Sequence, residues 1–489
     1  MSPARLVTRT AHRLDPDPRR VVSKLFVPGE EAPRSRSRAA VVIDRILALD
    51  EAEVSTLIDG VMADFRDRHR DLTDTFARHF AVVEHEILDR ASLTPQRRAL
   101  IGAYFTHEYS PEAAALFNPS MVAHPDQSGL APGQLRFVMT VRCVGEGHLS
   151  SIGFRTGILG PAGALTVDEP GPLLTTGITR AARYCRDVFL RRLLDLGNDE
   201  QTARLVLGEL PTTFDARQLD DAVHDIHEHT ANRQRVRTTV DHVRRVASAI
   251  YDLEFPAETA LSERLLWPSA PAESHGMEDA RLVRFVDDDG TVTYHATYTA
   301  YDGLQVASHL LSTKDFLHFH VTPMAGRAAQ NKGVALFPRR INGRYLALSR
   351  SDRESTALVD SDDLRIWNEP TALHTPAVGW ELIQVGNCGS PIETPAGWLV
   401  LTHGVGPMRV YGLGAMVLSL NDPSIVLGSL EEPLLVPAAD ERDGYVPNVV
   451  YSCGGQLHDG VLTIPYGISD TAIRFAQVHI AALLARILA

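Results

Sequence analysis

The sequence has few cysteines, no long apolar run and no excess of positive charge. Its 489 residues include four cysteines that are far apart and form no C-x-x-C pair: Cys143, Cys185, Cys388 and Cys453. This spacing does not favour a structural zinc site and fits reduced thiols in a cytoplasmic protein. No stretch approaches 18 uninterrupted apolar residues, and no apolar segment follows the first positive charges. We therefore expect neither a membrane span nor a signal peptide. The formal net charge of −13 argues against a nucleic-acid partner.

Several catalytic and cofactor motifs are also missing. There is no G-x-S-x-G, which argues against a serine hydrolase of that type. Gly145–His148 lacks both the third glycine of a dinucleotide fingerprint and the Lys-Ser/Thr of a P-loop. His224–His229 contains three histidines without the H-E-x-x-H spacing, so we interpret it as a solvated helix face. The sequence therefore predicts no metal and no organic cofactor.

The first quarter of the chain is predicted to be largely helical. Residues 1–40 carry arginines among prolines and serines, which favours a flexible tail. In residues 41–115 apolar side chains such as Val54, Leu57 and Ile58 recur at three- and four-residue steps, as on one face of a helix. Thr94-Pro95 is a helix start with a capping residue. We interpret this helical module as either a cap or an oligomerisation module that would form a homo-oligomer.

The hydrophobic period then changes twice. Residues 116–170 are β-rich, and residues 171–255 are helical again, with no proline or glycine from Asp215 to Tyr251. Residues 256–489 are almost all short strands separated by turn residues. The pattern predicts a β domain that is interrupted by a helical insertion.

A repeat is visible within the β-rich parts. Four strand openings, which start about 55 to 60 residues apart, are Met277–Ala280, Lys332–Pro338, Asn387–Ile392 and Pro447–Val450. Phe117-Asn118-Pro119-Ser120, with its second strand ending at Arg142, has the same arrangement. Five such units predict a mainly β protein, a five-bladed β-propeller with an N-terminal helical module and a helical insertion between the first and second blades. Two packed sandwiches are the alternative.

A propeller would bring polar residues at strand ends together at one central channel. These residues are Asn118, Arg142, Asp279, Arg350, His403 and Asp470.

The stretch Ser274–Phe285 contains the candidate chemical centre. Successive side chains of a strand point to opposite faces, so Asp279 and Arg281 can face one site together whereas Glu278 cannot. Asp279 is the candidate catalytic acid and Arg281 a candidate substrate contact. The alternative is a turn carboxylate that is paired with Arg281.

The other candidate residues are mostly basic. Arg350 and His403 end strands, and with Lys332 they form a cationic set that suits an anionic ligand such as phosphate. Glu146 and His148 lie in a glycine-rich loop that we expect at the mouth of the channel, where both could contact substrate.

Six motifs together resemble glycoside hydrolase family 130, the family of β-mannoside phosphorylases and some β-mannosidases. They are Phe117–Ser120, Glu278–Arg281, Leu336–Pro338, Gly389–Ile392 with Gly397–Leu399, His403–Val405 and Tyr466–Asp470. The resemblance covers residues 115–165 and 270–480, in the same order.

The resemblance implies a five-bladed propeller and an inverting reaction with one essential carboxylate, which falls on Asp279. The proton would reach the glycosidic oxygen through the 3-hydroxyl of the mannosyl residue. Inorganic phosphate would attack the anomeric carbon from the opposite face and give α-mannose 1-phosphate. A lone acid suffices there, because phosphate is already a nucleophile whereas an inverting hydrolase needs a second carboxylate.

The resemblance also assigns the other positions one by one. Lys332, Arg350 and His403 correspond to phosphate-binding residues, and Gln384 stands where the family has a lysine. The residues that hold the transferred sugar correspond to Asn118, Arg142 and Asp470.

We therefore expect a cytoplasmic β-mannoside phosphorylase that acts on a β-mannoside oligosaccharide and phosphate. An exo-acting β-mannosidase is the second hypothesis. Glu381, Glu393 or Glu146 would then act as a base about 6.5 to 9.5 Å from Asp279. A non-catalytic glycan-binding propeller is the third.

Overall fold

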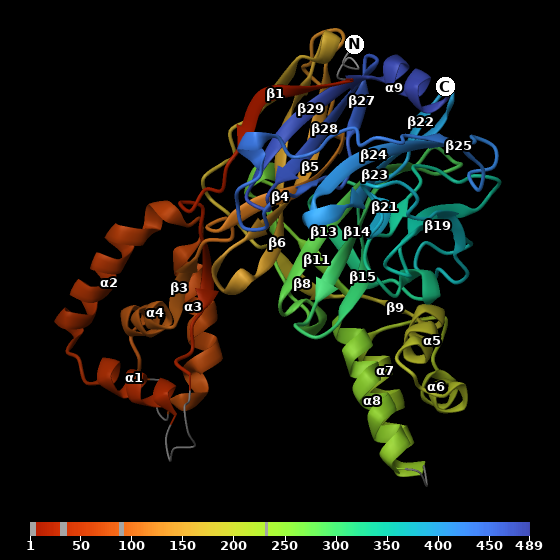
Figure 1. Cartoon of the computed structure of the whole chain (residues 1–489). Coiled ribbons are helices and arrows are strands. Elements are labelled where there is room, and N and C mark those ends of the chain that lie inside the picture. Colours follow the sequence, from red (N-terminus) through yellow and green to blue (C-terminus); the bar gives the residue numbers. More distant parts are fainter. Residues whose placement is uncertain (1–5, 30–36, 88–91, 230–232) are drawn as a thin grey trace. The chain divides into compact units, whose positions relative to one another are not determined.

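The computed structural model describes residues 6–29, 37–87, 92–229 and 233–489 (Figure 1). The chain divides into two compact units. The larger comprises Met1–Pro16, Ala114–Pro170 and Thr176–Ala489, and the smaller comprises Asp17–Ala113 and Gly171–Thr175. The larger unit is mainly β with a group of helices, and the smaller unit is mainly helical. Among the described residues, no helix combines the length and the apolar character needed to cross a membrane.

The smaller unit packs four helices around a shared apolar core, next to a two-stranded sheet. The helices are α1 (Arg38–Leu47), α2 (Glu51–Phe65), α3 (Leu72–Val83) and α4 (Pro95–Tyr104), and β2 (Val22–Leu25) pairs with β3 (Thr106–Tyr109). Asp50 and Glu53 form a capping box at the start of α2, and Thr94 caps α4. Ile43, Val54 and Phe76 are buried in the core that these helices share.

The expected flexible tail, residues 1–40, is wrong where the structure describes it. β1 (Val7–Leu14) pairs with β29 (Ala472–His479) near the other end of the chain, and β2 pairs with β3. The arginines that suggested a solvated segment are paired instead: Arg9 with Glu441 at 3.0 Å, and the buried Arg20 with Glu112. Ion pairing removes the charge repulsion that would keep such a segment extended in water. Residues 1–5 and 30–36 of this expected tail lie outside the described residues.

The larger unit repeats an antiparallel group of about four strands. Two groups share one large sheet, because a single parallel pair joins Gly276 to Ser150. Their strands are β4 (Ala115–Ala123), β5 (Leu135–Val144), β6 (Ser150–Leu159) and β7 (Leu165–Val167), then β13 (Gly276–Val286), β14 (Val292–Tyr301), β15 (Val306–Thr313) and β16 (His318–Pro323). β12 (Leu265–Leu266) pairs with β6. The first group begins with β4 at Ala115, one residue before the start of the predicted β-rich segment 116–170.

The remaining groups each form a separate sheet. The next has β17 (Ala335–Leu336), β18 (Tyr345–Ser349), β19 (Thr356–Ser361) and β20 (Thr371–His374). Another has β21 (Gln384–Asn387), β22 (Ile392–Thr394), β23 (Gly397–Val405), β24 (Tyr411–Leu418) and β25 (Val426–Ser429). The last has β26 (Val450–Tyr451), β27 (Gln456–His458), β28 (Val461–Ile468), β29 and, from the start of the chain, β1. α9 (Ile480–Ile487) follows β29 and buries Leu483 and Ile487 in the same core.

The helical insertion leaves the large sheet and returns to it. β8 (Ile178–Ala181) and β11 (Tyr251–Glu254) pair with each other, and β11 pairs with β16 at the sheet edge. Between them lie α5 (Arg186–Asp195), α6 (Glu200–Leu207), α7 (Ala216–His229) and α8 (Arg233–Ser248), with β9 (Tyr184–Cys185) paired to β10 (Thr213–Phe214). Phe189, Leu193, Phe214 and Val243 are fully buried in a core of the insertion's own. The insertion is therefore an independently packed element that is anchored to the β16 edge.

Candidate active site

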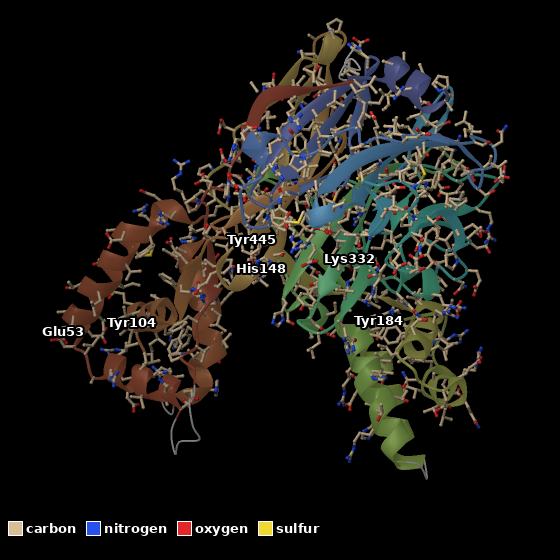
Figure 2. All side chains as sticks on the ribbon, in the orientation of Figure 1. Glu53, Tyr104, His148, Tyr184, Lys332 and Tyr445 are labelled. Carbon is tan, nitrogen blue, oxygen red and sulfur yellow. The ribbon has the colours of Figure 1, made fainter. Side chains whose placement is uncertain are left out.

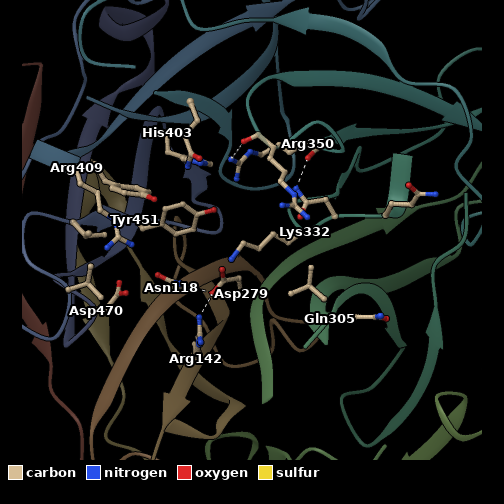
Figure 3. A pocket seen from close by; sticks show the side chains of 18 of the residues that line it. Asn118, Arg142, Asp279, Gln305, Lys332, Arg350, His403, Arg409, Tyr451 and Asp470 are labelled. Carbon is tan, nitrogen blue, oxygen red and sulfur yellow. Dashed lines mark hydrogen bonds and ion pairs between the residues drawn. The ribbon is translucent and has the colours of Figure 1, made fainter. Parts of the chain in front are cut away.

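A cavity of about 710 Å³ opens in the larger unit and is lined mainly by polar side chains (Figure 3). We call it the large cavity. The expected site residues that line it are Asn118, Arg142, Asp279, Lys332, Arg350, Gln384, His403 and Asp470. They come from all five strand groups, so the fold brings together side chains that are far apart in sequence.

Asp279 lies at a bulge in β13. The pairing of β13 with β14 shifts register between Glu278 and Arg281, and Asp279 has a left-handed backbone with φ +55°. A bulge leaves one residue unpaired and turns its side chain out of the regular alternation. Asn118 lies at a similar register shift in β4, with φ +48°. The two strained residues meet, since Asn118 Nδ2 donates to Asp279 Oδ1 at 2.6 Å.

Glu278 and Asp279 do not both face the large cavity, as strand alternation predicted, although one arginine contacts both carboxylates. Arg142 Nη1 donates to Asp279 Oδ1 at 3.2 Å, and Arg142 Nη2 donates to Glu278 Oε1 at 2.7 Å. Arg142 Nε donates to Ser150 Oγ at 3.0 Å, which fixes the guanidinium. One arginine thus holds both carboxylates, and of the two only Asp279 lines the large cavity.

The candidate substrate contact Arg281 packs against other protein groups. Its side chain is buried and does not line the large cavity. Nε donates to the Cys388 carbonyl at 2.8 Å, and Nη2 donates to Tyr451 Oη at 2.8 Å. Because the bulge rotates Asp279 relative to its neighbours, the i, i+2 relation no longer places Asp279 and Arg281 on one face. Arg281 supports the wall behind Asp279 instead.

The charges around Asp279 keep it ionised. Burial by itself would raise its pKa, but the positive charges of Arg142, Lys332 and Arg281 lower the pKa below its ordinary value. Figure 3 shows the Lys332 side chain directed toward Asp279.

The basic side of the cavity contains polar nitrogens that lack hydrogen-bond partners in the part of the chain that the structure describes. Arg350 is 7% exposed and His403 is fully buried, and among the described residues Arg350 Nε and both ring nitrogens of His403 have no hydrogen-bond partner of normal geometry. Burial and the nearby charge of Arg350 lower the pKa of His403 well below its ordinary value, so the ring is neutral. Gly386 allows this packing, because a Cβ there would lie 2.3 Å from Arg350 Cδ. Buried polar atoms without partners are costly, and an anion bound here would accept from Arg350 Nε and from the single N–H of the neutral His403 ring.

Asp470 is the second carboxylate of the large cavity. It lies in the turn between β28 and β29, with φ +50°. Burial, together with the negative charge of Asp279, raises its pKa to about 6. The two cavity carboxylates therefore have pKa values that their environments push in opposite directions.

The second half of the chain matches a known family. Residues 242–487, about half of the chain, match the sequence model of glycoside hydrolase family 130, which is described as β-1,4-mannooligosaccharide phosphorylase. The chain belongs to glycoside hydrolase family 130. The matched region includes Asp279, Lys332, Arg350, His403 and Asp470, so most of the large cavity comes from the part of the chain that defines the family.

Curated relatives in the family are called phosphorylases. The β-1,2-mannobiose phosphorylase of Listeria innocua is 35% identical over 226 residues, which cover 45% of this chain and 62% of that protein. The 1,2-β-oligomannan phosphorylase of a Thermoanaerobacter species is 35% identical over 211 residues, which cover 42% of this chain and 68% of that protein. A solved structure of the Listeria innocua enzyme with β-1,2-mannobiose aligns over 77% of this chain and 92% of that chain, with a TM-score of 0.46 and 23% identity.

Two expected substrate contacts of this family-130 chain lie outside the large cavity. Glu146 and His148 form a short exposed turn between β5 and β6, and neither lines the cavity. His148 stacks on Tyr445 with ring centroids 5.1 Å apart (Figure 2). The glycine-rich loop makes this short turn, with Gly147 and His148 in left-handed conformations, so the two side chains do not reach the cavity.

Sequence reasoning missed several cavity residues of the family-130 site. Two further arginines line the cavity, Arg353 after β18 and Arg409 in the turn between β23 and β24. Tyr411 and Tyr451 line it as well. Arg353 and Arg409 follow Arg350 and His403 within a few residues, so a search of the turns after those strand ends would have found them.

Proposed function

We propose that this chain is an inverting β-mannoside phosphorylase, which cleaves a β-mannosidic bond with inorganic phosphate and releases α-D-mannose 1-phosphate. Family membership and the names of the relatives support the reaction class. The observation that carries the proposal is the presence, in one cavity, of the buried carboxylate Asp279 and of buried Arg350 and His403 nitrogens that lack hydrogen-bond partners within the described ranges. Their N–H groups suit a phosphate anion, and no metal or organic cofactor is needed for this chemistry.

The proposed roles follow from the contacts of each side chain. We assign Asn118, Arg142 and Asp470 to the transferred mannosyl residue. Asp279 lies between them and Lys332 (Figure 3). Asp279 gives its proton to the 3-hydroxyl of that sugar, which passes a proton to the glycosidic oxygen. A phosphate oxygen forms the new bond to the anomeric carbon while the bond to the leaving sugar breaks. Asp279 ends as a carboxylate, and the leaving sugar has a free hydroxyl.

A general acid must carry a proton, whereas the positive charges of Arg142, Lys332 and Arg281 favour the ionised form of Asp279. Bound phosphate would offset the positive charge of Lys332 and of Arg350. The pKa of Asp279 would then rise toward the range where the carboxyl group can hold the proton. Phosphate would thus have two functions in the reaction, as nucleophile and as the charge that enables the acid.

The β-mannosidase hypothesis lacks the base that it required. Glu381 is buried and accepts from the Ala377 backbone, Glu393 pairs with Arg339 at 2.8 Å, and Glu146 is exposed in its turn. None of the three carboxylates lines the large cavity. Asp470 is the cavity carboxylate that a hydrolase would have to use.

We also propose that the five strand groups are the blades of a propeller. The convergence of strand-end and turn residues from all five groups on one cavity supports this arrangement, because blades around a common axis direct equivalent ends to one channel. β1 would complete the last blade from the N-terminal end of the chain.

The function is tested by product analysis. The protein is incubated with β-mannobioses of each linkage, with and without inorganic phosphate. We expect mannose 1-phosphate only when phosphate is present. Free mannose that forms equally without phosphate would instead support the hydrolase. No turnover, with sugar binding unaffected by Asp279→Asn, would leave the glycan-binding hypothesis.

A further inference from the structure

One wall of the large cavity is attached to the helical insertion. Leu304, Gln305 and Val306, at the turn between β14 and β15, line the cavity. Arg245, near the end of α8, donates from Nη2 to Asp302 Oδ2 at 2.7 Å and to Gln305 Oε1 at 3.2 Å. The insertion therefore contacts the cavity wall through a charge-assisted hydrogen bond.

Asp302 connects this contact to the shape of the turn. Its Oδ1 accepts from the backbone N–H of Leu304 at 2.9 Å and from that of Gln305 at 2.6 Å, while Oδ2 accepts from Arg245. The other side of the turn is confined by His275, because a Cβ at Gly303 (φ +93°) would lie 2.7 Å from its ring. The Asp302 side chain thus fixes the backbone of the turn and also accepts a hydrogen bond from the guanidinium group of Arg245.

A second, smaller cavity of about 60 Å³ lies on the other side of this wall. Gln305 and Val306 line both cavities, and Arg245, Val246 and Ala249 of the insertion line the smaller one. A thin wall with space behind it can move into that space when its contact is removed. Arg245 lines this smaller cavity and contacts the wall through Asp302 and Gln305.

We infer that Arg245 is a positioning residue through which the helical insertion holds the wall Leu304–Val306 against the second sugar, the one that leaves in cleavage and accepts in synthesis. This inference rests on the proposed function. Gln305 lies on the opposite side of Asp279 from Asp470, away from the residues proposed to hold the transferred mannosyl group (Figure 3). Leu304 is 94% exposed and offers an apolar surface that the face of a sugar ring can cover.

The test measures synthesis from α-D-mannose 1-phosphate with D-mannose as the acceptor. In Arg245→Ala we expect the KM for mannose to rise about fivefold or more, because a small displacement of a binding wall weakens the contacts that orient a substrate. kcat and the KM for mannose 1-phosphate should stay within about twofold. Arg245→Lys keeps a cation near Asp302, so its KM for mannose should rise less than that of Arg245→Ala. Arg244→Ala, which changes an exposed arginine on the same helix, is the matched control and should leave all constants unchanged.

Two outcomes would overturn the inference. One is an unchanged KM for mannose in a folded Arg245→Ala protein. The other is a lower Tm together with a lower kcat and similar increases in the KM values for mannose and mannose 1-phosphate. If Arg245→Ala does not fold, Arg245→Gln keeps the aliphatic stem and carries the same expectation. A wild-type protein that makes and consumes no mannose 1-phosphate would contradict the proposed function instead, so the two failures are distinguishable.

Discussion

Gln384 is the position where this chain carries an amide in place of the lysine that the resemblance implies. It lines the large cavity together with Arg350 and His403. In Gln384→Lys an added cation would attract the phosphate dianion, so we expect the KM for phosphate to fall severalfold, about 1 kcal/mol of binding free energy. Steady-state kinetics of phosphorolysis at varied phosphate measure the change. Gln330→Lys places the same charge elsewhere on the cavity wall, and an equal fall in both variants would contradict a specific role for residue 384.

Asp470 should control the acid side of the pH profile. Its pKa is raised from 3.8 to about 6, so the folded protein keeps this carboxyl protonated over a pH range in which the unfolded chain would lose the proton. Protonation therefore stabilises the fold below about pH 6, and this stabilisation is lost as the pH rises through that value. Sugar hydroxyls donate to the ionised form, so we expect kcat/KM to decline below about pH 6.

The measurement is the pH dependence of kcat/KM for wild type and Asp470→Asn. The variant cannot titrate at residue 470. Its kcat/KM should be lower than that of the wild type, and its pH profile should lack the decline near pH 6. Phosphate itself titrates in this region, and that contribution remains in both proteins. An identical acid limb in both would assign the decline to phosphate alone.

At the scale of single elements, the sequence pattern predicted the regular strands but not the bulges and turns at their ends. The recurring strand openings and ends identify the residues that converge, and the structure brings Asn118, Asp279 and Asp470 to one cavity. Those same residues have left-handed backbones at bulges or turns, which two-residue alternation cannot represent. This is why the expected placement of Arg281 was wrong. The strand β1 was missed for another reason, because its partner β29 is near the opposite end of the chain and local pattern contains no information about such pairing.

A glycine in β21 tests whether the basic side of the cavity depends on close backbone approach. A Cβ at Gly386 would lie 2.3 Å from Arg350 Cδ and 2.7 Å from His403 Cε1. In Gly386→Ala both side chains must move, so we expect the KM for phosphate to rise about tenfold or more while the fold is retained. Gly379→Ala adds a methyl group where there is open space, and phosphate kinetics of the two variants isolate the steric effect. An unchanged KM for phosphate in Gly386→Ala would contradict this prediction, because it would show that Arg350 can move aside without weakening phosphate binding.

At the scale of the whole molecule, the large cavity belongs entirely to the larger unit. We expect a bound anion to supply the hydrogen-bond partners that Arg350 Nε and His403 lack among the residues described. A ligand that binds the native state stabilises it by about 2.7 kcal/mol at one hundred times its Kd. We therefore expect inorganic phosphate to raise the Tm by a few degrees, with a saturating dependence on its concentration. Differential scanning calorimetry at constant ionic strength measures the shift, and chloride should not reproduce it. Arg350→Ala removes a proposed ligand to phosphate and should abolish most of the shift. If its Tm rises with phosphate as steeply as that of the wild type, the anion binds elsewhere and the basic side of the cavity has another purpose.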